Sequence, residues 1–190
     1  MKCRAMACPI HHIETTVGLR RKGGNWTIRL ALTIALLLGA VPALRAHGDL
    51  DLQIDAVSAE IDQRPNDAAL YLKRAELYRN VEHFLFASDD LDQAEKLDPS
   101  LALVHLARAR NYLEWKKPAM GLPEIERFLE TRPAGQLATI AHEVRGHLLT
   151  AASRPLEAAQ EFSAAIELAN APSPDLYMHR ATALQSAGEA

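Results

Sequence analysis

Three prolines that recur at a fixed interval constrain the fold of this chain more than any other feature of its sequence. Pro65, Pro99 and Pro133 stand 34 residues apart, and each follows a run with apolar residues at helical spacing. Because proline cannot continue a helix, each of them is expected to follow the end of one. The interval leaves room for two helices and two turns. The sequence therefore predicts an all-α chain of repeated helical hairpins.

Side chains of the same kind also recur in register between these prolines. Each unit has a ring or imidazole, a small residue four positions later, an apolar or aromatic residue seven positions later and, in the first three units, a small residue sixteen positions later. These positions are Tyr71, Ala75, Tyr78 and Ala87; His105, Ala109, Tyr112 and Gly121; His142, Gly146, Leu149 and Ala158; and Tyr177, Ala181 and Leu184. Small residues let two helices approach closely, while larger residues fill the gaps between units.

On these residues the chain resembles the tetratricopeptide repeat family over residues 66–190. The expected units are residues 68–101, 102–135 and 139–172, with a half unit at 174–190. A capping helix is expected within residues 47–65, where apolar residues follow helical spacing. In the second unit Pro118 and Pro123 crowd the start of the second helix, which predicts a helix that is short or begins late.

An arginine and an acid also recur 16 residues apart. The three pairs are Arg74 with Asp90, Arg108 with Glu124, and Arg145 with Glu161. In a helical hairpin of this size each pair falls on facing helices, where the two side chains can form a charge-assisted hydrogen bond. A partly buried charge needs such a partner, so we interpret these residues as structural pairs rather than as a ligand-binding ladder. Arg180 has no such partner, since the chain ends before a second helix.

The resemblance implies a concave groove, lined by the first helix of each unit, that binds an extended peptide or a partner helix. The residues expected to face this groove are Leu72, Glu76, Arg79, Leu103, Leu106, Arg110, Leu113 and Ile140. Leu106 and Leu113 are expected to bury an apolar side chain of the partner, while Glu76, Arg79 and Arg110 fix its register. The carboxylate clamp of the chaperone-binding members is not expected here, because apolar or acidic residues occupy its positions.

The first 46 residues predict a leader. They carry seven Lys or Arg and a single acid, Glu14, and an uncharged apolar run of 12 residues extends from Leu30 to Val41. That run is short for a membrane span and typical of a signal peptide, with cleavage expected after Ala43 or Ala46. The chain would then act in the periplasm or at the cell envelope. An uncleaved anchor is the alternative, and it would give the only contact with a membrane.

Two further expectations concern the leader. Translation from a start near Val17 would give a basic segment of the usual length before the apolar run. Both cysteines, Cys3 and Cys8, lie in the leader, so the rest of the chain is expected to have no disulfide and no thiol chemistry.

Charge and motifs exclude several classes of function. Residues 47–190 carry 14 basic and 23 acidic side chains, a balance that repels nucleic acid. No nucleophile motif or phosphate-binding glycine loop is present there, so we expect no enzymatic activity and no cofactor. His142 and His147 are five residues apart, on different faces of a helix, which argues against a zinc-protease motif. His47 would be N-terminal after cleavage and could chelate copper there, but no second ligand set is visible.

Together these observations predict an exported, non-enzymatic scaffold that binds a protein partner in its groove. Two alternatives stay open. The chain could be a regulatory or targeting segment of a longer envelope enzyme or assembly protein, or a weak metal-binding exported protein. Because solenoids need a polar cap at each end, the open last helix also predicts a longer parent chain, self-association or fraying.

Overall fold

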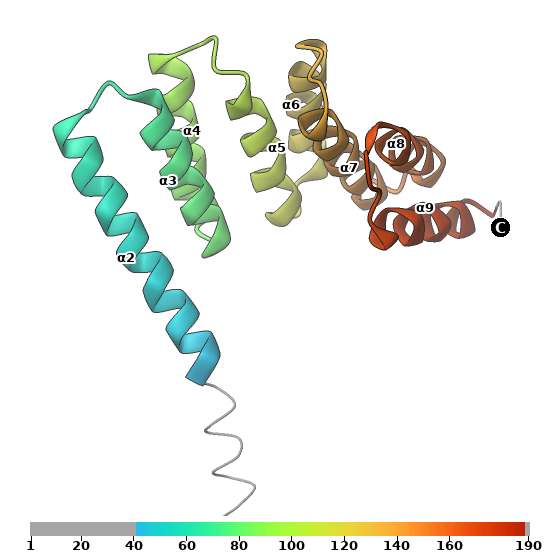
Figure 1. The fold of residues 1–190 in the computed structure, drawn as a ribbon, viewed down its shortest axis with the longest axis horizontal. Helices are drawn as coiled ribbons and strands as arrows, with labels where there is room; N and C mark the ends of the chain where they lie inside the picture. Colours follow the sequence, from blue (N-terminus) through green and yellow to red (C-terminus); the bar gives the residue numbers. More distant parts are fainter. Residues whose placement is uncertain (1–40, 189–190) are drawn as a thin grey trace, which may run out of the picture. The chain divides into compact units, whose positions relative to one another are not determined.

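The computed structural model describes residues 41–188, which form eight α-helices and no strand (Figure 1). The helices are α2 (Val41–Gln63), α3 (Ala68–Asn80), α4 (Phe84–Leu97), α5 (Leu103–Glu114), α6 (Pro118–Glu130), α7 (Gln136–Ala151), α8 (Pro155–Leu168) and α9 (Pro174–Ala187). The predicted fold class, an all-α solenoid of helical hairpins, is confirmed for these residues.

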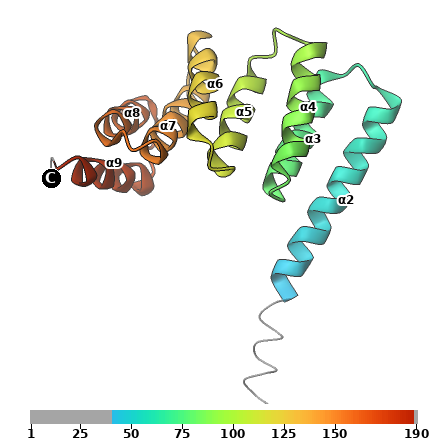
Figure 2. The same ribbon diagram turned by 180° about the vertical axis from the view of Figure 1, so that it is seen from behind.

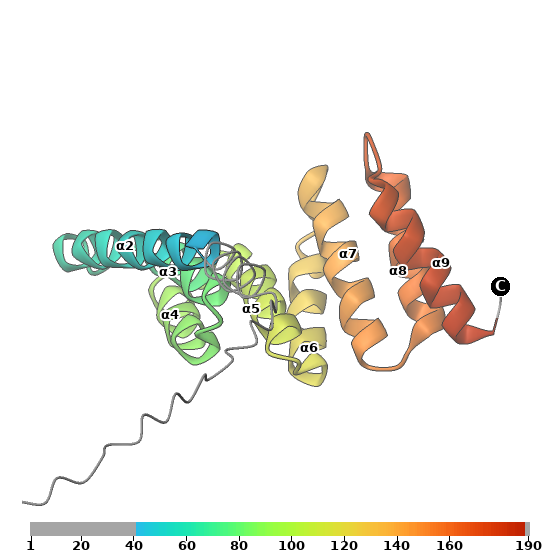
Figure 3. The same cartoon turned by 90° about the horizontal axis from the view of Figure 1, so that it is seen from below.

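The helices pair as the repeat implies. α3 packs with α4, α5 with α6 and α7 with α8, while α9 packs on α8 (Figures 1 and 3). Consecutive hairpins contact one another, and the view from behind shows them following in chain order (Figure 2). The first helices also touch directly, α3 with α5 and α5 with α7. The core is therefore divided into clusters along the array rather than gathered at one centre.

The helix before the first hairpin, α2, begins at Val41. Ile54, Val57 and Ile61 are its buried apolar residues, and the last two pack with Leu70 of α3. The positions Ala43 and Ala46, where cleavage was expected, thus lie within the first turns of α2. The expected n-region, most of the apolar run, the start near residue 17 and both cysteines lie outside the described residues. Within residues 41–188, none of the helices combines the length and apolar character that crossing a membrane would require.

The second unit differs from its prediction. α6 begins at Pro118 and runs for 13 residues, so it is neither short nor late. Proline is well tolerated at the first position of a helix, since its missing N–H would have no partner there. Pro123 lies inside the helix and is exposed to solvent.

The turn inside each hairpin repeats with the same backbone geometry. Glu82, Lys116 and Ser153 follow α3, α5 and α7, with φ values of 60°, 58° and 58°. The next amide donates back to a carbonyl five residues earlier, as from His83 to Tyr78 at 2.8 Å and from Arg154 to Leu149 at 2.9 Å. This pattern is the Schellman motif that ends many helices. The left-handed position is one that glycine occupies without strain.

Replacing Lys116 with glycine should therefore stabilise the protein. A side chain in the left-handed region costs free energy that glycine does not, and we expect the free energy of unfolding to rise by about 0.5–1 kcal/mol. Chemical denaturation of both proteins measures it. Gln160→Gly is the matched control, because Gln160 is exposed inside α8. There glycine should cost about 1 kcal/mol. A loss of stability in both variants would contradict this account of the turn.

Candidate functional site

The arginine of the first predicted structural pair lies against its acid. The Nε and Nη2 atoms of Arg74 each donate to a carboxylate oxygen of Asp90 at 2.7 Å, and Nη1 donates to the Ser58 hydroxyl of α2 at 3.0 Å. Asp90 is buried. The hydrogen bond to Asp90 raises the pKa of Arg74 above its ordinary value, despite partial burial. This arginine joins both helices of its hairpin to α2.

The arginine of each of the other two pairs also contacts an acid of the preceding hairpin. Arg108 contacts Glu124 at 3.2 Å within its own hairpin, and it also contacts Glu95 of α4 at 2.7 Å. Its hydrogen bond lowers the pKa of Glu95. Arg145 contacts Glu161 at 3.3 Å and Glu126 of α6 at 3.7 Å. The geometry gives these arginines a structural role and leaves Arg108, which is buried, out of reach of a partner protein.

The charged residues expected to line the groove lie together but bind one another. Arg79 contacts Glu76 at 2.7 Å and also pairs with Glu114 of α5, while Arg110 contacts Glu76 at 3.4 Å. Arg79 is buried. The structure therefore differs from the expectation that Arg79 fixes the register of a partner, because its guanidinium is used in joining α3 to α5. Arg110 and Glu76 remain partly exposed.

The leucines expected in the groove have different environments. Leu106 is only 6% exposed and packs in a cluster with Ala141 and Val144 of α7. It was expected to bury a partner side chain, and it is a core residue instead, because α5 and α7 touch on the face that was assigned to the groove. Leu103 is 38% exposed. The half-buried Leu72, Leu113 and Ile140 pack against the edges of the core clusters.

A cleft opens beside Ile140 at the end of the third hairpin. Its volume is about 370 Å³, and its walls include Thr139, Ile140 and Glu143 of α7 with Leu168 and Leu176 from the following helices. Among the residues expected in the groove, Ile140 is the one that lines this cleft. This cleft is open to solvent, and both apolar and polar residues line it.

An exposed apolar surface at the start of α4 was missed by the sequence reasoning. We name it the aromatic patch, and it consists of Phe84, Leu85, Phe86 and Trp115. Leu85 is 65% exposed and Phe86 is 58% exposed. A cleft of about 470 Å³ lies between these residues. The signal was present in the sequence: three consecutive apolar residues cannot all face one core from a helix, so at least one must point to solvent.

The aromatic patch is held in place by ring contacts to both hairpins. Phe84 stacks on Trp115 at 6.1 Å between ring centroids, and Phe86 lies 5.4 Å from Tyr78. The ammonium group of Lys117 sits 3.2 Å from the centre of the Trp115 ring. These contacts restrict the motion of large side chains that remain accessible. Such side chains lose little conformational entropy when they enter an interface.

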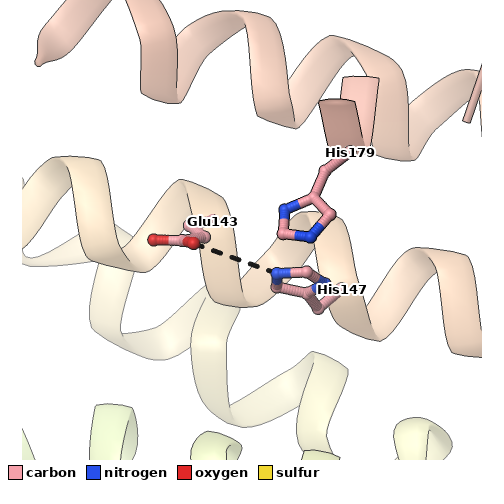
Figure 4. Close-up of side chains that lie close together, drawn as sticks. All are labelled: Glu143, His147 and His179. Atoms are coloured by element: carbon pink, nitrogen blue, oxygen red, sulfur yellow. Dashed lines mark ion pairs between the residues drawn. The ribbon is translucent and has the colours of Figure 1, made fainter. Parts of the chain in front are cut away.

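The histidines of α7 face different partners. The Nδ1 atom of His142 lies 2.8 Å from Glu161, and His105 is placed alike against Glu124, so both belong to the structural pairs. His147 lies on another face, close to Glu143 of its own helix and to His179 of α9 (Figure 4). The sequence reasoning separated His142 from His147 but missed His179, which is 32 residues from His147.

Comparison with known proteins identifies the fold. No protein-family model matches the sequence, and no curated protein matches it. Among solved structures, the chain is similar to "MamA 41-end from Desulfovibrio magneticus RS-1", with a TM-score of 0.66 and 15% identity over 79% of this chain and 82% of that one. It is also similar to a "Crystal structure of MamA", with a TM-score of 0.62 and 17% identity over 76% and 82% of the two chains. At this level of identity the likeness concerns the helical-repeat fold alone.

Proposed function

We propose that this protein is a non-enzymatic interaction module that binds a protein partner through the aromatic patch. The observation that carries the proposal is the exposure of Leu85 and Phe86 beside the ordered rings of Phe84 and Trp115. Exposed apolar clusters of this kind mark contact sites, and aromatic residues are enriched where binding energy is concentrated. The helical-repeat fold supports the proposal, since such arrays present extended surfaces to partners.

The groove is the second candidate surface. The cleft beside Ile140 and Glu143 supports it, together with the partly exposed Leu72, Leu103, Arg110 and Leu113. An extended peptide lying there would contact apolar side chains and one carboxylate. Leu106 does not contribute to this surface, because it is only 6% exposed and belongs to the core.

We also propose that the protein acts outside the cytoplasm, in the periplasm or at the envelope. The support is the basic segment followed by an apolar run and small residues in the sequence. Self-association through α9 is proposed too, since Tyr177 and Met178 are 46% and 58% exposed on the last helix of the array. Fractionation of the cells tests the location. The size of the products of cross-linking in intact cells tests self-association.

Replacing Phe86 with aspartate should abolish capture of the partner without unfolding the protein. An acid in the first turn of a helix is favourable, and α4 has none there, so the change should not weaken the helix. At a binding hot spot we expect at least a tenfold loss of affinity. Cross-linking in intact cells followed by quantitative mass spectrometry measures the captured protein.

Two further variants sharpen this test. Leu52→Asp is the matched control, because Leu52 is 68% exposed on α2, away from the aromatic patch. It should capture the partner as the unchanged chain does. Leu103→Asp tests the groove. Loss of capture with Leu103→Asp and not with Phe86→Asp would show that the groove, and not the aromatic patch, binds the partner. Unchanged capture in both variants would contradict both proposed binding surfaces.

A further inference from the structure

Three side chains suited to metal binding meet between the third hairpin and the last helix. Glu143 and His147 are four residues apart, which places them on the same face of α7. The Nε2 atom of His147 lies 3.9 Å from a carboxylate oxygen of Glu143. His179 comes from α9, and its ring centroid is 4.5 Å from that of His147 (Figure 4). One ligand atom from each residue lies within 4.8 Å of the others.

Their separation is compatible with one small cation. Zinc binds imidazole nitrogen and carboxylate oxygen at about 2.0–2.2 Å, so the ligand atoms of one tetrahedral site lie about 3.3 Å apart. The side chains of Glu143, His147 and His179 would need to approach by up to about 1.5 Å. All three are partly exposed, so rotation about their own bonds can supply this movement.

One histidine of the cluster has a ring nitrogen without a hydrogen-bond partner among the described residues. The Nδ1 atom of His179 is buried and has no hydrogen-bond partner among the described residues. A buried polar atom in that state costs free energy, and a bound ligand would compensate it.

The cluster also has a wall and an opening. The ring centroid of Phe162 lies 5.1 Å from that of His147 and 5.5 Å from that of His179, so the cluster has an apolar wall on one side. A cleft of about 440 Å³ adjoins the two histidines, and Phe162, Thr150 and Thr182 are among the other residues that line it. Three protein ligands beside an open cleft leave a fourth position for water or for a group of a partner.

We infer that Glu143, His147 and His179 form a binding site for a zinc ion that joins α7 to α9. Two imidazoles and one carboxylate are a ligand set that zinc accepts. Because α9 packs on α8, a metal bond to α7 adds a second restraint on α9. This inference does not depend on the aromatic patch or on its partner.

Titration of the full chain with Zn²⁺ alone, against a chromophoric chelator, tests the site. We expect one equivalent of zinc to bind, and replacing either His147 or His179 with glutamine to weaken this binding at least tenfold. Zinc should also raise the melting temperature of the unchanged chain and not that of these variants, since metal that binds only the folded state stabilises it. Melting in EDTA verifies that each variant folds.

Glutamine replacement of His83 is the matched control, because His83 is exposed and lies in the turn before α4. It should bind zinc as the unchanged chain does. The leader contains further histidines and cysteines. If the titration and the thermal shift are the same in His147→Gln and His179→Gln as in the unchanged chain, the zinc is bound elsewhere and the inference is wrong. Absence of zinc binding to the unchanged chain would overturn it equally.

Discussion

Replacing Asp90 with alanine is expected to lower the free energy of unfolding by about 3–5 kcal/mol. The change removes the acceptor of two hydrogen bonds of 2.7 Å from Arg74 and leaves a partly buried guanidinium whose remaining hydrogen-bond acceptor is the Ser58 hydroxyl. An uncompensated charge in such a place costs several times more than a surface pair contributes. Denaturation with urea, followed by circular dichroism, measures the loss.

Two further variants separate the cost of the unpaired charge from the value of the pair. Asp89→Ala is the control, since Asp89 is an exposed acid in the same helix, and it should change stability by less than about 0.5 kcal/mol. The double variant with Arg74→Met and Asp90→Leu replaces both charges by apolar groups and should recover most of the loss. If the double variant is no more stable than Asp90→Ala alone, the loss does not arise from the unpaired arginine.

Replacing Phe162 with alanine should cost a similar amount, about 3–5 kcal/mol. Phe162 is 1% exposed and packs in the cluster that joins α7, α8 and α9. Its ring fills the space above Gly146, where a methyl group would lie 2.7 Å from the Cε1 atom of Phe162. Urea denaturation measures the change, with Phe86→Ala as control, because that ring is 58% exposed and should contribute little to stability.

The same contact explains why the small residue of the third unit is glycine rather than alanine. Gly146→Ala alone should destabilise the protein by about 1–3 kcal/mol, since the ring of Phe162 cannot give way easily. Combined with Phe162→Leu, the alanine should cost less than it does beside phenylalanine, because the smaller side chain leaves room for the methyl group. Strictly additive losses would show that the two residues do not share this space.

The repeat allowed much of the fold to be predicted, because its signals are local. Proline positions, small residues and helical spacing lie within one hairpin, and the structure has α3 to α9 where these signals place helices. Each of the three pairs of an arginine and an acid also lies within a single hairpin, and the structure places each arginine next to its acid.

What the sequence could not supply depends on how neighbouring hairpins meet. Leu106 was assigned to the groove because its position within one helix pointed there, yet the contact between α5 and α7 covers it. Arg79 is engaged by Glu114, which is 35 residues away in the chain. His179 lies next to His147 because α9 packs on α8. The two histidines are far apart in the sequence, so their spacing did not predict this contact.

The arginines that reach back to the preceding element have a consequence for how the array loses structure. Arg74 donates a hydrogen bond to Ser58 of α2, while Arg108 and Arg145 form ion pairs with Glu95 of α4 and Glu126 of α6. Each hairpin is thus energetically coupled to the one before it, which favours concerted rather than piecemeal unfolding of neighbours. Among residues 41–188, no ion pair joins Arg180 of α9 to a preceding helix, and its guanidinium lies against the ring of Tyr177 on its own helix. We therefore expect α9 to open at a lower free energy than the hairpins, which these contacts couple to one another.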